Sequence, residues 1–274
     1  MKPLFIFFRF IRFFFQATTA YRVHSPFVFE FIKNVLEDKR SFYSFGGIES
    51  IRRKLYQNKE SIEVTDFGAG SQVIKSRVRK IKSMAKSSLT PAYYCQILFR
   101  IVHHYKPQTI LELGTSFGVS TLYQALPDSR AKVITLEGCP HVARIAQQHF
   151  KIMEAKNIQL INGPFDQVLP NALKDLEKLD YVFIDGNHRK EPTLRYFEQC
   201  LQYAHNDSIF IFHDIHWTTD MEAAWAEIQQ HPQVQVTIDL FFMGIVFFRK
   251  EQKEKEHFKL LPIRWKPWVM GFFE

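Results

Sequence analysis

The sequence contains few cysteines. Three are present among 274 residues, at Cys95, Cys139 and Cys200, and no two of them form a Cys-x-x-Cys pair. This odd and scattered set argues against a disulfide framework and against a structural zinc site. It is typical of proteins in a reducing compartment, so we expect a cytoplasmic location.

A membrane-spanning apolar run is also lacking. The Phe-rich stretch at residues 4–15 is interrupted by Arg9 and Arg12. About 12 helical residues span roughly 18 Å, short of the roughly 30 Å hydrocarbon core of a bilayer. The arginines also argue against a signal peptide. Two interpretations stay open: the helix packs on its own protein or on a second copy in a homodimer, or it lies in a membrane interface, which would make the protein peripheral.

Internal repeats and low-complexity linkers are absent, whereas apolar residues are abundant. Hydrophobic residues make up 46% of the chain, which is enough for a full core, and 28 of the residues are Phe. The formal net charge is +8. A basic protein favours anionic partners such as nucleic acid, phosphorylated substrates or an anionic membrane, and the charge alone does not choose among them.

The first third of the chain is expected to be helical. Residues 1–60 have a helical pattern with breaks at residues 24–26 and 46–47. A further helix is expected at residues 73–86, with lysines and arginines away from its apolar face. Those cations form either an ordinary solvated face or a lid or docking surface for an anionic group.

After Pro107 the pattern changes to alternating strands and helices. Strands are expected at residues 109–113, 132–137, 158–161, 181–185, 208–213, 234–240 and 244–249. Helices are expected at residues 119–125, 141–155, 192–204 and 221–230. This alternation predicts an α/β fold with a mainly parallel, doubly wound sheet. The last two strands are too close for a crossover, so they should form an antiparallel hairpin.

A glycine turn between a strand and a helix is the most informative segment. The strand ends in Glu112-Leu113, the turn contains Gly114 and Gly118, and the next strand ends in Glu137. Glycines let the backbone approach a ligand closely. An acid at the end of the second strand is placed to accept hydrogen bonds from ribose hydroxyls. The spacing is not that of a dinucleotide site, and Glu112 would repel a pyrophosphate but face an amino group.

The segment ELGTSFGVST at residues 112–121 resembles motif I of the class I S-adenosylmethionine-dependent methyltransferases, particularly small-molecule O-methyltransferases of the catechol and macrocin types. Segments at 133–138, 160–170, 179–188 and 208–216 follow in the family's order. The resemblance implies a Rossmann-like seven-stranded sheet ending in the hairpin. It also implies a methyltransferase domain at residues 89–250, after a helical extension at 1–88 and before a tail at 251–274. The extension would act as a lid, a dimer contact or a membrane contact.

The resemblance also implies the cofactor contacts. The turn holding the methionine end would comprise Glu112, Gly114, Ser116 and Gly118, and Ser120 would lie near the methionine carboxylate.

Toward the other end of the cofactor, the resemblance places Glu137 on the ribose hydroxyls. Gly163 and Asp166 would border the adenine, and Asp185 would lie beside the methyl sulfonium.

Two segments at neighbouring strand ends carry groups for catalysis, Asp-Gly-Asn-His at 185–188 and His-Asp-Ile-His at 213–216. In the metal-dependent O-methyltransferases that these segments resemble, such positions hold magnesium. By that resemblance Asp185 and Asp214 are metal ligands and His188 is the general base. His213 stands where the family has an acid, and Ile215 where catechol-type enzymes have Asn. His213 as a ligand would favour manganese, iron or zinc over magnesium.

A second glycine segment, at residues 64–71, imitates the first. No strand ending in an acid follows it at the required distance. It is therefore expected to be either an ordinary turn or a loop over the active site.

Three functions are weighed. The leading one is O-methylation of a small-molecule or saccharide hydroxyl, with or without a metal. A nucleic-acid methyltransferase would suit the +8 charge, but the chain lacks the Asn/Asp-Pro-Pro-aromatic segment that grips a flipped base. A non-catalytic, membrane-associated protein that keeps the fold is the third, motivated by the Phe-rich N-terminus and the aromatic tail.

Overall fold

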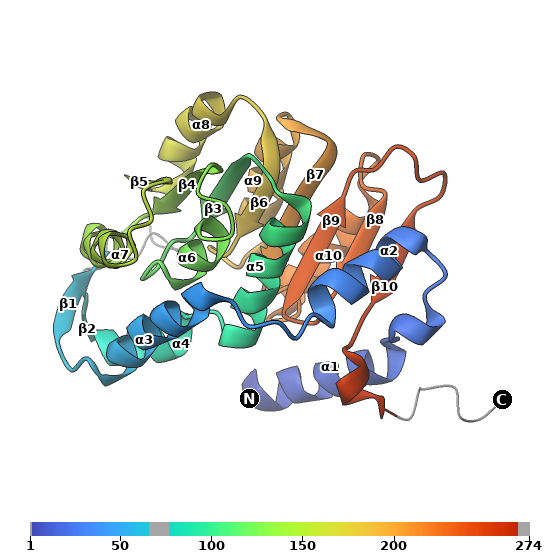
Figure 1. Ribbon diagram of the computed structural model, residues 1–274, viewed down its shortest axis with the longest axis horizontal. Coiled ribbons are helices and arrows are strands. Elements are labelled where there is room, and N and C mark those ends of the chain that lie inside the picture. The colour runs from blue at the N-terminus through green and yellow to red at the C-terminus, as the bar shows by residue number, and fades with distance from the viewer. Residues whose placement is uncertain (1, 66–76, 268–274) are drawn as a thin grey trace.

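A mostly parallel sheet of eight strands forms the centre of the protein (Figure 1). The computed structural model describes residues 2–65 and 77–267. The spatial order of the strands is β10-β8-β9-β7-β6-β3-β4-β5, and β9 alone in this sheet runs antiparallel to its neighbours. The strands are β3 (Thr109–Leu113), β4 (Lys132–Glu137), β5 (Ile158–Asn162), β6 (Leu179–Ile184), β7 (Ala204–His213), β8 (Val236–Asp239), β9 (Met243–Phe247) and β10 (Glu256–Lys259).

The α/β fold, its seven expected strands and the terminal hairpin are confirmed, with bounds that shift by a few residues. The eighth strand, β10, was not predicted. It pairs parallel with β8, with Phe258 opposite Ile238. The charged run that precedes β10 hides it in the sequence, because edge strands commonly carry charges and lack a continuous apolar pattern.

Helices cover both faces of the sheet because alternate strand residues point to opposite sides. Ile110 faces one core cluster, together with side chains of α2 (Pro26–Phe31), a π-helical turn (Ile32–Leu36) and α5 (Ala92–Tyr105). Leu111 faces the other cluster, which is closed by α8 (Phe165–Leu176), α9 (Lys190–Leu201) and α10 (Thr219–Gln230). The N-terminal helices α2 and α5 therefore belong to the main core.

A third cluster closes the β4–β5 end of the sheet. It is formed by α3 (Tyr43–Gln57), α4 (Ile81–Ser88), α6 (Val119–Ala125) and α7 (Pro140–Ile152), together with part of α5. The helix break expected at residues 46–47 is wrong, because α3 runs through both glycines. A Cβ at Gly47 would lie 2.8 Å from Cε of Met153, so this glycine permits close packing and does not end the helix.

The helix expected at residues 73–86 is wrong in its first part. Residues 77–80 form strand β2 (Arg77–Lys80), which pairs antiparallel with β1 (Ser61–Val64). Backbone hydrogen bonds to β1 therefore override the helical spacing of the apolar residues, and α4 begins only at Ile81. The glycine segment at residues 66–71 lies outside the described residues.

Helix α1 (Lys2–Gln16) packs one of its faces on the end of the fold. Phe10 and Phe13 contact Phe241 with ring centroids 5.0 and 5.4 Å apart. Arg9 binds Glu222 at 2.6 Å and donates a hydrogen bond to the carbonyl of His216. Packing on its own protein is thus confirmed for this face. Neither α1 nor another helix of the described residues has the length and apolarity to cross a bilayer.

The glycine turn after β3 and the end of β6 approach each other at backbone distance. The amide of Asp185 donates to the carbonyl of Leu113 at 2.9 Å. Gly114, with φ of 108°, lies so close that an added Cβ would be 2.0 Å from the carbonyl oxygen of Asp185. Only glycine combines this conformation with this approach.

We expect Gly114→Ala to lower the free energy of unfolding by on the order of 3 kcal/mol, because the methyl group would force two strand ends apart. Urea unfolding followed by circular dichroism measures the change. Gly46→Ala is the control, since a Cβ there meets nothing within 4 Å. Inside α3 it should stabilise the protein by about 0.5–1 kcal/mol. Equal stability of the two variants would contradict the account.

Candidate active site

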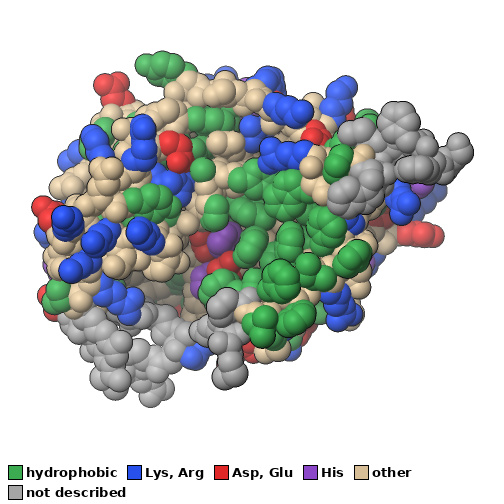
Figure 2. Space-filling view, turned by 90° about the horizontal axis from the view of Figure 1, so that it is seen from below, with side chains coloured by type: hydrophobic (Ala, Val, Ile, Leu, Met, Phe, Trp, Pro, Cys, Tyr) green, Lys and Arg blue, Asp and Glu red, His purple; other side chains and the backbone are tan. Residues whose placement is uncertain are grey.

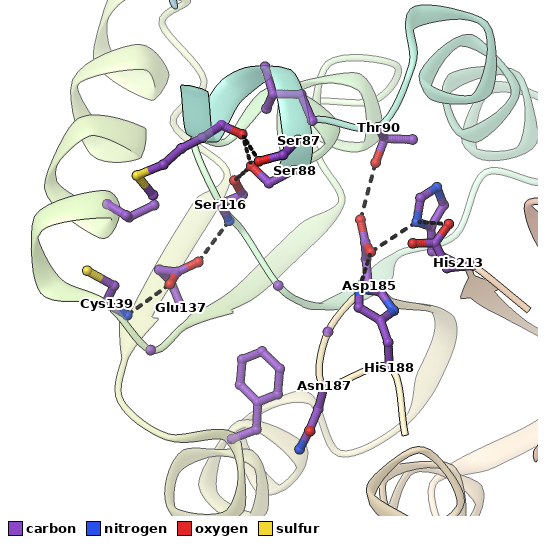
Figure 3. A pocket seen from close by; sticks show the side chains of 18 of the residues that line it. Ser87, Ser88, Thr90, Ser116, Glu137, Cys139, Asp185, Asn187, His188 and His213 are labelled. Atoms are coloured by element: carbon purple, nitrogen blue, oxygen red, sulfur yellow. Dashed lines mark hydrogen bonds and ion pairs between the residues drawn. The ribbon is translucent and has the colours of Figure 1, made fainter. Parts of the chain in front are cut away.

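A cavity of about 600 Å³ opens at the carboxyl edge of the sheet. It lies at the ends of β3, β4, β6 and β7, where open α/β sheets bind ligands. The segment between α4 and α5 forms its opposite wall (Figure 3). The predicted site residues that line it are Gly114, Ser116, Glu137, Asp166, Asp185, His188, His213 and Asp214.

Glu112 is not brought to the cavity. It is fully buried, and its carboxylate accepts hydrogen bonds from Ser120, Thr121, Gln124 and Thr135. Burial raises the pKa of Glu112, and the four donors offset only part of that rise. The carboxylate therefore ties β3 to α6 and β4 beneath the turn.

Gly118, Ser120 and Gly163 also lie outside the cavity lining. Gly118 has φ of 79°, and an added Cβ would lie 2.5 Å from a ring carbon of Phe150. Gly163 donates its amide hydrogen to the carbonyl of Glu137 at 3.0 Å. These residues shape the turns that carry the lining side chains.

Glu137, at the end of β4, projects into the cavity. Its carboxylate accepts hydrogen bonds from the amides of Ser116 and Cys139, both at 2.8 Å (Figure 3). Burial raises the pKa of Glu137 to about 7, although these amides act in the opposite direction. The side chain thus links the glycine turn to the end of β4 and presents an acceptor to the cavity.

An aromatic and acidic pair follows β5. Asp166 lies in the first turn of α8 and forms a two-pronged ion pair with Arg195 at 2.9–3.1 Å. Phe165 packs edge-on against Tyr196, with centroids 5.8 Å apart. Gly186 leaves room for Phe165, since a Cβ there would lie 2.7 Å from its ring. This region offers a flat apolar surface beside a carboxylate.

Four titratable side chains meet at the ends of β6 and β7. Nδ1 of His213 lies 3.1 Å from Oδ1 of Asp185 and 3.6 Å from Oδ1 of Asp214. Nε2 of His188 lies 3.7 Å from the same Asp185 oxygen, and Thr90 donates to the other oxygen at 3.2 Å (Figure 3). The structure thus brings the predicted catalytic residues together.

The charges of this cluster are mutually dependent. Burial would lower the pKa of His213, but the two aspartates outweigh it and raise that pKa to about 9. Burial would likewise raise the pKa of Asp185, but His213 and His188 lower it below its ordinary value. The pKa of Asp214 is raised, because burial exceeds the effect of the histidines. His213 is therefore a cation between two carboxylates.

These residues do not fit a divalent metal ion. Across residues 2–65 and 77–267, no three His, Cys, Asp or Glu side chains are grouped so as to hold one. The Nδ1 atom of His213 already faces both carboxylates that would be the ligands. Ile215, the residue after Asp214, is buried and has no side-chain oxygen.

The sequence did not predict that the segment before α5 forms a wall of the cavity. Ser88 lies within hydrogen-bond distance, 3.2 Å, of Ser116 in the glycine turn, and Thr90 reaches Asp185. Tyr196 and Trp217 also line the cavity. The run Ser-Ser-Leu-Thr-Pro at 87–91 was a usable signal, because Ser, Thr and Pro mark helix starts. Nothing in that run indicated contact with a site more than 25 residues away.

Part of the chain is similar to known methyltransferases. Residues 111–215 match the family model "Methyltransferase domain". O-methyltransferase hkm8 of Aspergillus hancockii is 29% identical over 126 residues, which cover 44% of this chain and 49% of that protein. Catechol O-methyltransferase of Mus musculus is 31% identical over 111 residues, covering 38% of this chain and 42% of that protein. The matched stretch thus spans half or less of each relative.

A solved structure supports the fold. The O-methyltransferase from Bacillus cereus, in complex with SAH, superposes with a TM-score of 0.51 at 18% identity, over 80% of this chain and 96% of that one. The family match begins in β3 and ends just after β7, so it contains the glycine turn, Glu137 and the Asp185–Asp214 cluster. With this arrangement at the carboxyl edge of the sheet, the matched part of the chain is similar to the class I S-adenosylmethionine-dependent methyltransferases.

Proposed function

We propose that the protein transfers the methyl group of S-adenosylmethionine to a hydroxyl oxygen of a small molecule, a saccharide included. The observation that carries the proposal is the layout of the cavity. In Figure 3, Glu137 lies on one side of the cavity and the cluster of Asp185, His188 and His213 lies on the other, and Gly114 also lines the cavity. An elongated cofactor that crosses Gly114 would bring its reactive end to titratable groups.

In this arrangement Glu137 would accept hydrogen bonds from the ribose hydroxyls, and Phe165 and Asp166 would hold the adenine. The methionine part crosses Gly114 and Ser116, where the backbone allows close approach. The sulfonium then lies near Asp185, whose lowered pKa keeps the carboxylate negative. A negative group stabilises the positive sulfonium when it binds.

Methyl transfer is an in-line displacement, and the protein has to orient the nucleophile and take its proton. The hydroxyl oxygen attacks the methyl carbon, the carbon–sulfur bond breaks, and its electron pair stays on sulfur. We assign proton acceptance to the imidazole of His188, which lines the cavity, and Asp185 stabilises the imidazolium that forms. His213 holds Asp185 and Asp214 in place as a cation between them.

Cofactor affinity should rise with pH around the pKa of Glu137. With that pKa at about 7 in the free protein, the carboxyl group is largely neutral at pH 6 and ionised at pH 8. A carboxylate accepts hydrogen bonds from ribose more strongly than the neutral acid does. Calorimetric titration with S-adenosylhomocysteine should therefore show affinity increasing up to about tenfold over this range.

Two variants control this measurement. Glu137→Gln should bind weakly at all pH values, and Glu254→Gln, an exposed acid between β9 and β10, should keep the wild-type profile. A pH profile of Glu137→Gln parallel to that of the wild type would refute the role of Glu137.

His188→Ala should lower turnover by about 10²–10⁴-fold, the usual contribution of a general base. The assay follows tritiated methyl from S-adenosylmethionine into a hydroxyl substrate found by screening phenols and sugars. Affinity for S-adenosylhomocysteine should change little, because His188 is placed on the substrate side. His24→Ala, at an exposed histidine between α1 and α2, is the control. Full turnover by His188→Ala would remove it from the mechanism.

Chelation should leave turnover unchanged. The cluster already holds its positive charge in His213, so removal of divalent ions with EDTA takes nothing from it. The same tritium assay, run after EDTA treatment and after addition of magnesium or manganese, makes the comparison. Loss of turnover that either ion restores would show a metal site and overturn the metal-free mechanism.

A further inference from the structure

Helix α1 has an apolar outer face as well as an apolar inner one. The outer face, as used here, consists of Leu4, Phe5, Phe7, Phe8, Ile11 and Phe15, which are 38–77% exposed. A helix on the surface of a soluble protein normally turns polar residues outward. Figure 2 shows this concentration of apolar side chains. A contiguous patch of this kind marks a surface that contacts a partner or a membrane.

Positive charge accompanies the outer face. Arg12 is exposed on α1 itself, next to the outer-face residue Ile11. Residues 77–88, which form β2 and α4, contain five lysines and arginines and no acid. Figure 1 shows α4 and α1 along the same lower edge of the molecule, and Figure 2 shows Lys and Arg side chains on the face that carries the apolar patch.

The cavity opens between these two regions. Arg9 of α1 binds the carbonyl of His216, and the next residue, Trp217, lines the cavity and is 40% exposed. Phe242 also lines the cavity and packs edge-on against Phe241, which supports α1. Arg79 and Lys86 line the cavity on the side of the basic segment. In Figure 2 the histidines and acids of a hollow are visible beside the apolar patch. Whatever covers the outer face of α1 therefore adjoins the cavity mouth.

We propose that the outer face of α1, together with the basic side chains of residues 79–86, docks on an anionic lipid bilayer. The helix lies flat in the headgroup region and inserts its phenylalanines, and the cavity mouth faces the bilayer. Apolar insertion and attraction of cations to anionic headgroups add together at such a surface.

Charge favours a bilayer over a second copy of the chain as the occupant. In a symmetric dimer through this face, the same surface would meet itself, and cations such as Arg12, Lys80 and Lys82 would approach their own counterparts. Like charges in contact repel, whereas an anionic bilayer supplies the opposite charge along the whole face.

Co-sedimentation of the full chain with phospholipid vesicles tests the proposal. The wild type should pellet with vesicles of phosphatidylcholine and phosphatidylglycerol, more weakly with phosphatidylcholine alone, and less as salt is raised. Phe8→Gln and Phe15→Gln should each lower the partition coefficient about tenfold. Lys80→Gln and Lys82→Gln should each lower it about fivefold on the anionic vesicles alone.

Matched controls alter other surfaces. Ile152→Gln removes an apolar side chain that is 65% exposed at the end of α7, on the helix that leads away from the cavity edge. Lys156→Gln and Lys253→Gln remove exposed cations elsewhere. All three should pellet as the wild type does.

Two outcomes would overturn the proposal. One is wild type that stays in the supernatant with anionic vesicles, or Phe8→Gln/Phe15→Gln protein that pellets equally well. The other is a lipid-free dimer, seen by sedimentation equilibrium, that Phe8→Gln/Phe15→Gln dissociates, because a second copy would then cover the face. Affinity for S-adenosylhomocysteine, measured on the same samples, tests the proposed function separately, since docking does not depend on it.

Discussion

The buried carboxylate of Glu112 fixes the geometry on which the cavity depends. It accepts hydrogen bonds from two hydroxyls and an amide of α6 and from the hydroxyl of Thr135 on β4. An ionised carboxylate without water costs several kcal/mol unless donors replace that water. Because the donors come from separate elements, their shared acceptor holds the glycine turn against the strand that ends in Glu137. The residue thus supports the glycine turn from beneath, whereas Gly114, Ser116 and Glu137 line the cavity.

A second electrostatic constraint acts at the ends of β6 and β7. Asp185 and Asp214 follow neighbouring strands, and two carboxylates so close would repel each other and bind protons. Protonated His213 reduces this repulsion, because its Nδ1 lies 3.1 Å from Oδ1 of Asp185 and 3.6 Å from Oδ1 of Asp214. The difference between the two acids follows from position, because Asp185 also faces His188 and Thr90 whereas Asp214 is dominated by burial. One negative and one proton-prone carboxyl group therefore line the same cavity.

The strands and the glycine turn were predictable because their signals are local. Buried parallel strands are short apolar runs, and Gly114 and Glu137 stand at fixed places relative to them. The proximity of Asp185 and Asp214 was predictable because the carboxyl ends of parallel strands meet at one edge of the sheet. The role of Glu112 was not predictable, because it depends on which side of β3 faces α6. Strand β2 and the contact of Thr90 with Asp185 were not predicted for a related reason, since their partners are distant in the chain.

The proposed roles of the glycine turn and of the Asp185 cluster both require that the cavity holds S-adenosylmethionine along the line from Glu137 to Asp185. A crystal structure of the protein with S-adenosylhomocysteine tests it most directly. The account predicts ribose hydroxyls within hydrogen-bond distance of Glu137, adenine against Phe165 and sulfur beside Asp185. A complex with the ligand bound elsewhere, or a cavity without ligand at saturating concentration, would contradict it.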